Sequence, residues 1–394
     1  MHDRITNIDA VRGSALFGIL VVNAMVFSSP WYGTGLMPPG GRGPLDDALA
    51  FVISTVFELK FYLLFSFLFG YSVTLQMQSA ERAEAAFLPR MLRRQAGLFL
   101  IGACHAVLLF HGDILATYAV LGLLLLMTRR WSDATRLWLA AAIILATAAF
   151  WLLLALLQAS EPMRQDSVAL QQHAEAVAAA FRGLMPSIVG QRLEELQSFL
   201  PMLLLLQAPC ALAMFLLGFV AGHRRFFEAR ETYGAYLGRA SRWGLLVGLP
   251  GGLAYTAAAQ LAPGSPLETA ALALSIVTSP FLTMALMAAM LTIFDSGRTG
   301  PWREYLASAG RMALSNYLLQ SLACAFIFYG YGLGLIGRLS IAQTLGTAIL
   351  IFGAQLLASH WWLRRFRYGP AEWLLRAMTI GQWPQWRADR HAGG

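Results

Sequence analysis

A succession of long apolar runs restricts the fold of this chain more than any other feature. A helix needs about 20 mostly apolar residues to cross the hydrocarbon core of a bilayer, and such runs recur along the whole sequence. They lie near residues 8–29, 48–76, 94–111, 112–129, 136–158, 199–222, 243–262, 267–294, 306–330 and 338–363. We therefore expect an all-α integral membrane protein, a bundle of about ten transmembrane helices that forms a single polytopic domain over residues 1–394.

The composition supports an outer surface that faces the lipid bilayer. Of the 394 residues, 57% are hydrophobic and only 13% are charged, whereas a soluble domain has about 25% charged residues. The net charge of +8 comes almost entirely from arginine, because Lys60 is the only lysine. The arginines cluster at the ends of the apolar runs, which is typical of membrane topology, so no nucleic-acid partner is expected.

The connections between the runs alternate in charge. Arginine-rich connections follow every second run, and the connections between them hold few basic residues. Because cytoplasmic loops carry the excess of Lys and Arg, we expect both termini on the cytoplasmic side, with residues 364–394 as a cytoplasmic interfacial tail. The segment 159–198 is then an external loop, in which apolar residues at helical spacing predict an amphipathic helix on the outer leaflet.

Ionisable residues inside apolar runs are costly in a bilayer and are therefore candidates for function. Asp9 and Arg12 lie three apart and can pair on one helix face, the face to which Asn23 also returns. An ion pair that anchors the helix at the membrane boundary is the alternative. Glu58 and Lys60 interrupt the second run. Lys60 would provide a compact point charge, or would extend its ammonium group to the outer interface.

The clearest chemical pattern is the stretch CHAVLLFHGDIL between the third and fourth runs. His105 and Asp113 are eight residues apart, and His111 lies close to Asp113. A histidine with a nearby carboxylate suits a general base, because the carboxylate fixes the tautomer and stabilises the imidazolium. Hydrogen bonding between helices is the alternative. Two histidines and an aspartate can bind a metal, but no further ligand cluster accompanies them and no metal is expected.

Two amides stand in the ninth run. Asn316 and Gln320 lie four apart and share one helix face. Hydrogen bonds between helices explain them adequately.

Five blocks of sequence are found in order along nearly the whole chain. They read RITNIDAVRGSALFGILVVNA, FELKFYLLFSFLFGYS, HAVLLFHGDILATYAVLG, GRMALSNYLLQS followed by FYGYGLGL, and RFRYGPAEWLLR. These blocks resemble the YeiB-like family of bacterial inner-membrane proteins (domain of unknown function 418), which implies a multi-pass protein of the bacterial inner membrane. The positions that match this pattern are Asp9, Arg12, Asn23, Lys60, His105, Asp113, Asn316, Gln320, Glu372, Trp373 and Arg376.

The first block also resembles the opening of the transmembrane acyltransferase superfamily, in which Asp-x-x-Arg-Gly begins the first helix. In the O-acyltransferase branch a histidine stands where this chain has Asn23, and asparagine cannot serve as a base. The N-acetyltransferase branch has asparagine there and a histidine in the following loop. The corresponding residues 28–47 hold no histidine.

We therefore expect an acyltransferase that takes an acyl group from a cytoplasmic thioester donor of the acyl-CoA type. The acceptor would be a lipid, a glycan or a small molecule at the membrane or outside. Arg12, or Arg93 and Arg94, would hold the phosphates of the donor. The donor is a substrate, and no permanently bound cofactor is expected.

Within this hypothesis the polar residues of the membrane take separate roles. His105, assisted by His111, would remove the proton from the acceptor, and Asp113 would orient the histidine. Lys60 or Asn23 would stabilise the oxyanion of the tetrahedral intermediate.

Two other functions fit the same sequence. In a secondary transporter or exporter, a proton or substrate path would be lined by Asp9, Arg12, Glu58, Lys60, His105 and Asp113. A structural or sensing membrane protein without turnover is the third possibility. The sequence implies no particular oligomeric state.

Overall fold

The computed structural model describes residues 2–160, 167–227, 230–297 and 299–387. In these ranges the chain folds into α-helices and contains no strand, and the longer connections are residues 29–43 and 329–340. The α-helices are α1 His2–Ser28, α2 Pro44–Val52, α3 Lys60–Arg82, α4 Phe87–Leu108, α5 Leu115–Met127, α6 Asp133–Ser160, α7 Ser167–Arg182, α8 Met185–Met202, α9 Ala208–His223, α10 Arg230–Trp243, α11 Leu249–Leu261, α12 Pro266–Asp295, α13 Trp302–Arg311, α14 Ala313–Phe328, α15 Ile341–Leu363 and α16 Pro370–Ile380. The π-helices are η1 Ile53–Phe57, η3 Leu203–Gln207 and η4 Gly244–Gly248, and η2 Thr128–Arg130 is a 3₁₀ turn.

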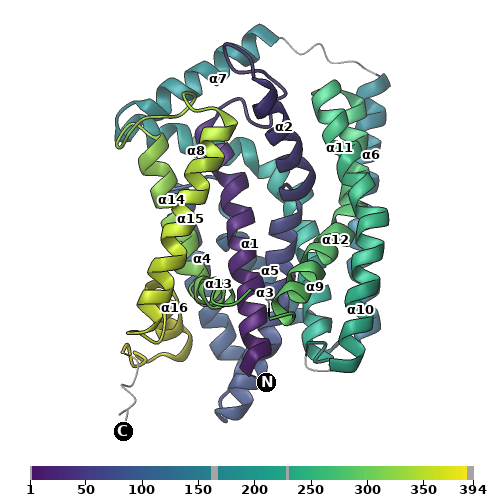
Figure 1. Ribbon diagram of the computed structural model, residues 1–394, viewed down its shortest axis with the longest axis vertical. Helices are drawn as coiled ribbons and strands as arrows, with labels where there is room; N and C mark the ends of the chain where they lie inside the picture. Colours follow the sequence, from purple (N-terminus) through teal and green to yellow (C-terminus); the bar gives the residue numbers. More distant parts are fainter. Residues whose placement is uncertain (1, 161–166, 228–229, 298, 388–394) are drawn as a thin grey trace.

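The helices form one bundle with two ends (Figure 1). The start of α1 and the helix α16 lie at one end, which we call the terminal end, and α2 and α7 lie at the other, the distal end. Helix α1 contacts α3, α13, α14 and α15, so it is the element around which both cavities described below are built.

Seven of the described helical segments are long and apolar enough to cross a membrane. They are Thr6–Ser28, Pro44–Arg82, Asp133–Ser160, Met185–His223, Gly234–Leu261, Pro266–Asp295 and Ile341–Leu363. Their outward faces are apolar: Leu145, Leu153 and Leu156 of α6 are exposed, as are Leu350 and Leu357 of α15. In water so large an apolar surface would drive aggregation, so the chain is a multi-pass membrane protein.

The prediction of about ten spans is not confirmed. Two of the predicted runs form shorter helices, and a third lies in α4, which has 22 residues but carries three arginines and is not among the seven segments. The runs 94–111 and 112–129 become α4 and α5, with a break between them. Helix α5 has 13 residues and is about 20 Å long, less than the ~30 Å of a hydrocarbon core. The run 306–330 is broken at Met312 into α13 and α14. The cytoplasmic position of both termini stays a prediction.

Close packing against α1 accounts for the separate helix α13. A Cβ atom at Gly310 would lie 1.9 Å from the backbone oxygen of Asp9, and one at Gly13 would lie 2.1 Å from the backbone oxygen of Leu306. Without side chains at the crossing, α13 packs directly on the backbone of α1.

The predicted external segment 159–198 differs in two ways from its expected form. The amphipathic helix α7 is present, but its apolar face packs on the protein, where Phe181 stacks on Tyr329 with ring centroids 4.5 Å apart. The next helix, α8, begins at Met185 and continues through η3 into α9, so this span starts well before the expected position 199. Residues 161–166 lie outside the described ranges.

Candidate functional site

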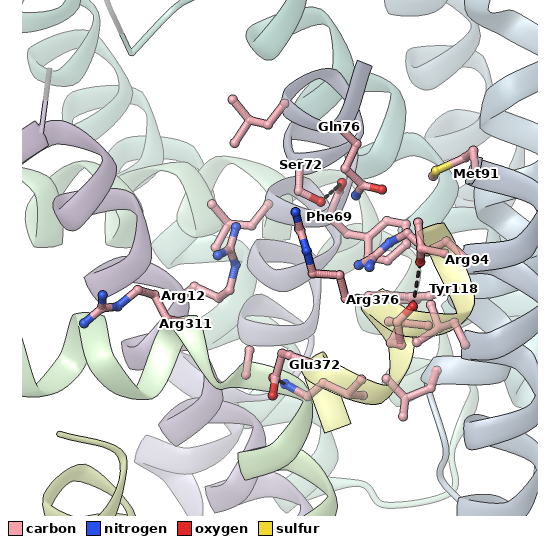
Figure 2. A pocket seen from close by; sticks show the side chains of 18 of the residues that line it. Arg12, Phe69, Ser72, Gln76, Met91, Arg94, Tyr118, Arg311, Glu372 and Arg376 are labelled. Atoms are coloured by element: carbon pink, nitrogen blue, oxygen red, sulfur yellow. Dashed lines mark hydrogen bonds between the residues drawn. The ribbon is translucent and has the colours of Figure 1, made fainter. Parts of the chain in front are cut away.

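A cavity of about 420 Å³, here called the arginine cavity, lies between α1, α3, α4, α14 and α16 (Figure 2). The polarity of its lining changes along α1. Arg12 lines the polar part, and Ile19, about 10 Å further along the helix, lines the apolar part. The basic residues of the lining are Arg12, Arg90, Arg94, Arg311 and Arg376. The apolar and aromatic part includes Ile19, Phe65, Phe69, Leu98, Tyr118 and Tyr317.

The arginine cavity carries an excess of positive charge. Among its lining residues in the described part of the chain, Glu372 is the only acidic side chain. Arg12 donates a hydrogen bond to Asp9 at 2.7 Å, but Arg94 and Arg376 form no ion pair with any described residue, and the buried Nε of Arg94 has no hydrogen-bond partner there. Figure 2 shows Arg12, Arg94 and Arg376 around the same space. The guanidinium groups of Arg94 and Arg376, which have no ion pair within the described ranges, suit a phosphate-bearing ligand.

Glu372 joins α16 to α14. Its Oε1 accepts hydrogen bonds from the backbone N–H groups of Leu314 (2.6 Å) and Ser315 (3.1 Å), and its Oε2 accepts one from the Ser315 hydroxyl (2.5 Å). Burial raises the pKa of the Glu372 carboxyl, and these hydrogen bonds oppose the rise. Pro370 at the first turn and Gly381 with φ of 73° past the end set the limits of α16. Glu372 therefore caps α14 and holds one wall of the arginine cavity.

The connection between α4 and α5 brings His105 and Asp113 together. Both side chains are buried, and Nδ1 of His105 lies 2.8 Å from Oδ1 of Asp113. Since a carboxylate only accepts, we assign the proton to Nδ1, which leaves Nε2 with its lone pair. The second oxygen, Oδ2, accepts from the backbone N–H of Ala116 at 2.8 Å and so caps α5. Nε2 of His105 is buried and has no hydrogen-bond partner among the described residues.

Tyr317 lies between the His105–Asp113 pair and the two cavities. Its ring packs against that of His105 with centroids 4.9 Å apart. Tyr317 lines both the arginine cavity and a second cavity of about 130 Å³, which we call the distal chamber. The polar side chains that line the distal chamber include Asn23, His111 and Gln207. The two cavities share three lining residues, Ile19, Ile114 and Tyr317.

Lys60 and Glu58 lie outside both cavities. Lys60 is fully buried, and its Nζ donates to the backbone oxygen of Ser54 at 3.3 Å. Glu58 accepts a hydrogen bond from the hydroxyl of Tyr32. The sequence grouped these residues with His105, but the structure does not bring them to the same space.

Asn316 and Gln320 also lie away from the cavities. Asn316 donates to the hydroxyl of Ser359 at 2.9 Å, and Gln320 donates to the side chain of Gln355 at 2.9 Å. Both contacts are buried and join α14 to α15, so these amides make the hydrogen bonds between helices by which the sequence was interpreted.

Trp373 and Arg93 do not line the arginine cavity either. Trp373 stacks on Trp383 with ring centroids 4.6 Å apart and donates to the backbone oxygen of Pro384 at 2.8 Å, which fastens the segment after α16. Arg93 is exposed on the outer side of α4.

The structure adds three lining residues that the sequence did not single out as site residues. Arg90 and Arg311 extend the positive charge, and Tyr317 separates the two cavities. Arg90 could have been predicted from the sequence, because it precedes Arg94 by four residues and so shares its helix face. No signal in the sequence distinguishes Tyr317. Among the described residues no three His, Cys, Asp or Glu side chains group closely enough to hold a metal ion.

Comparisons with known proteins give matches of unknown function. A family model described as "Protein of unknown function (DUF418)" matches residues 221–382. The uncharacterized protein YxaH of Bacillus subtilis (strain 168) is 31% identical over 397 residues, covering 97% of this chain and 96% of that protein. The uncharacterized protein YeiB of Escherichia coli (strain K12) is 27% identical over 402 residues, covering 96% and 97%. An uncharacterized 39.9 kDa protein of Bacillus acidopullulyticus is 24% identical over 394 residues, covering 97% and 95%.

Proposed function

Because this chain belongs to the DUF418 family, whose function is unknown, its activity has to be argued from its own site, and we propose that it is a membrane acyltransferase. Its donor is a phosphate-bearing thioester of the acyl-CoA type, and His105 is its general base. The observation that carries the proposal is the arginine cavity, which leads from unpaired arginines to Tyr317 beside His105.

The dimensions favour a donor with a flexible arm. Arg94 and His105 lie eleven positions apart on α4, about 16 Å along the helix axis. A thioester at the end of a flexible arm would reach from the arginines toward the histidine, and coenzyme A thioesters have this form. The volume of about 420 Å³ must hold the arm as well as the acyl group, so a short acyl group fits better than a fatty chain.

The transfer follows from the arrangement of His105. A hydroxyl or amine acceptor attacks the thioester carbonyl, and its proton passes to Nε2 of His105, whose Nδ1–H is held by Asp113. The tetrahedral intermediate then breaks its C–S bond, and the leaving thiolate takes the proton back from His105. The products are an ester or amide and the free thiol. His105 itself lines neither cavity and meets them through Tyr317, which packs on its ring. Lys60 donates to the backbone oxygen of Ser54 and is given no part in this step.

Turnover of a thioester by the purified protein tests the proposal. The protein is placed in nanodiscs of bacterial lipid extract with acetyl-, octanoyl- or palmitoyl-CoA, and free coenzyme A and acylated products are measured by mass spectrometry. His105→Ala should lower the rate about 100-fold or more. The matched control is His360→Ala, because His360 packs on Tyr305 with ring centroids 4.4 Å apart, outside the cavities. Absence of coenzyme A release with all three thioesters, or a full rate in His105→Ala, contradicts the proposal.

Transport is the second candidate, and one observation favours it. The arginine cavity and the distal chamber lie in series along α1 and share a wall at Tyr317, which is the arrangement that a transporter with two alternating openings would use. Proteoliposomes that accumulate a labelled organic phosphate under a proton gradient, without releasing coenzyme A from acetyl-CoA, would favour transport over acyl transfer.

We place the protein in the bacterial inner membrane with both termini in the cytoplasm. The arginine-rich connections, the arginines of the cavity walled by α16 and the bacterial relatives support this placement. Alkaline phosphatase fused after residue 394 should be inactive in cells, and a fluorescent protein at the same position should fluoresce. The reverse result would place the terminal end outside.

A further inference from the structure

Interruptions of several helices meet at the distal chamber. Phe57 ends the π-helix η1, Leu59 has a φ of 64° although it is not glycine, and Gln207 ends the π-helix η3. The connection between α4 and α5 supplies Phe110 to Gly112. Irregular backbone within a membrane bundle is tolerated where it lines a cavity or is buried in protein, and strained backbone and π-bulges are frequent at functional sites.

Several polar side chains line this chamber without hydrogen-bond partners among the described residues, and the buried hydroxyls of Tyr62 and Tyr317 are two of them. Asn23 from α1 and Gln207 from η3 line it and make no side-chain hydrogen bond to any described residue, and the buried Nδ1 of His111 has no partner there. Polar groups within a bilayer normally find partners. Convergent polar groups without partners in a small chamber therefore indicate a ligand that brings its own donors and acceptors.

We propose that the distal chamber binds the acceptor, a small polar nucleophile with several hydroxyl or amine groups. This inference rests on the proposed acyl transfer and assigns its second substrate. The volume of about 130 Å³ is below the ~300 Å³ at which sites for drug-sized ligands begin, so it holds a compact polar group, alone or at the end of a larger lipid or glycan. Asn23, Gln207 and His111 hold the hydroxyl or amine groups.

The position of Tyr317 explains how donor and acceptor meet. The donor occupies the arginine cavity and the acceptor the distal chamber, and both are lined by Tyr317, whose ring covers His105. Displacement of this ring brings both substrates to Nε2 of His105, where the acceptor hydroxyl or amine loses its proton to the imidazole. Until then the separation protects the thioester from water that enters the distal chamber.

Thiol labelling tests whether the chamber admits a small polar molecule. The protein carries Cys104→Ser, since Cys210 and Cys324 are buried, together with Val22→Cys, which lines the chamber. Added to intact spheroplasts, 2-aminoethyl methanethiosulfonate should modify Val22→Cys about tenfold faster or more than Val21→Cys, whose position is fully buried in close-packed surroundings. Ethanolamine should slow the reaction at Val22→Cys. Equal rates at the two positions in folded protein overturn the inference.

Acceptor kinetics test the polar contacts. With acetyl-CoA as donor and glycerol or ethanolamine as acceptor, Asn23→Leu and Gln207→Leu should each raise the acceptor KM about tenfold and leave the donor KM unchanged. Gln76→Leu is the matched control, because Gln76 lines the arginine cavity only, and it should leave the acceptor KM unchanged. If turnover occurs and neither chamber variant changes the acceptor KM, the chamber does not bind the acceptor and the proposed acyl transfer stands. If no thioester is turned over, the proposed function fails. The labelling rate at Val22→Cys, measured with and without ethanolamine, still decides whether the chamber binds a polar amine.

Discussion

Tyr317 packs its ring on His105, with centroids 4.9 Å apart, and the same side chain lines both cavities of the bundle. Tyr317, together with Ile19 and Ile114, therefore forms the wall between the arginine cavity and the distal chamber, and its ring covers the buried imidazole. The arrangement makes Tyr317 the residue whose size should control communication between the two ends of the protein.

Truncation of Tyr317 should connect the cavities. In Tyr317→Ala, a thiol introduced by Val22→Cys should react with a charged methanethiosulfonate added from the terminal end, in inverted vesicles. Tyr317→Phe keeps the ring and should leave that thiol unreactive from this side. Removal of a buried aromatic ring also costs about 3–5 kcal/mol of stability, so folding of the alanine variant is verified by size-exclusion chromatography. Equal reactivity in both variants would show that Tyr317 does not separate the cavities.

The unpaired arginines should decide the affinity for the donor. Arg94→Gln removes a charge that lines the arginine cavity, and a hydrogen bond to a charged group contributes about 1.5–3 kcal/mol. Binding of S-propyl-coenzyme A, a thioether that cannot transfer its chain, should weaken about 10- to 100-fold in calorimetry. Arg93→Gln, one position away and exposed, is the control and should bind as the unaltered protein does. Equal losses in both variants would indicate a general surface effect of charge.

Asp113 has two roles that substitution should separate. Asp113→Asn keeps an oxygen that can accept a hydrogen bond from the backbone N–H of Ala116 and so cap α5. Complete loss of such a cap costs about 0.5–2 kcal/mol of stability, so the melting temperature should fall only modestly. The asparagine no longer fixes the tautomer of His105, so the transfer rate should fall about 100-fold or more. Parallel melting and turnover measurements check this, and a rate loss no larger than the loss of folded protein would refute the positioning role.

Glu372 should make stability depend on pH. Burial raises the pKa of its carboxyl above the ordinary value of 4.5, so the folded protein binds this proton more tightly than the unfolded chain. The contribution of Glu372 to the free energy of unfolding is therefore most favourable below pH 4.5. It diminishes as the pH rises through the raised pKa and is constant above it. The difference in melting temperature between the unaltered protein and Glu372→Gln, measured from pH 4 to pH 8, should fall over that window. A difference independent of pH would contradict the raised pKa.

The crossing of α1 and α13 should not tolerate a side chain. A Cβ atom at Gly310 would lie 1.9 Å from the backbone oxygen of Asp9, so Gly310→Leu must push the helices apart and should cost at least the ~1–3 kcal/mol typical of overpacking. Gly353→Leu on α15 is the matched control, because nothing lies within 4 Å of a Cβ atom there. Melting in detergent should show a large loss only for Gly310→Leu.

The apolar runs allowed much of the helical architecture to be predicted. The runs at 8–29, 136–158, 267–294 and 338–363 agree closely with α1, α6, α12 and α15, because a long apolar run in a membrane has few alternatives to a helix. The division between the runs 94–111 and 112–129 agrees with the break between α4 and α5. The break at Met312 was not predicted, since it depends on the contact of Gly310 with α1, and local sequence does not record such a tertiary contact.

The candidate site could be predicted only in part. His105 and Asp113 meet because a short hairpin connects their helices, and Arg12, Arg94 and Arg376 gather in one cavity. Lys60 was grouped with them on its rarity, but a one-dimensional pattern does not show that Lys60 is left out of the lining of the distal chamber, to which Leu59 and Phe61 belong. The separation of the cavities by Tyr317 depends on the path of α14 beside α1 and α4, so no single block of sequence contains it.

The most direct test of the central claim is an electron cryomicroscopy map of the protein in nanodiscs with bound S-propyl-coenzyme A. The account predicts density in the arginine cavity, with phosphates against Arg90, Arg94 and Arg376 and the propyl group near Tyr317. Parallel maps without the thioether, in phosphatidylglycerol and in phosphatidylcholine nanodiscs, identify any density that comes from lipid headgroups. A cavity that holds only lipid in every map, or a thioether bound elsewhere, would contradict the claim that this cavity is the donor site.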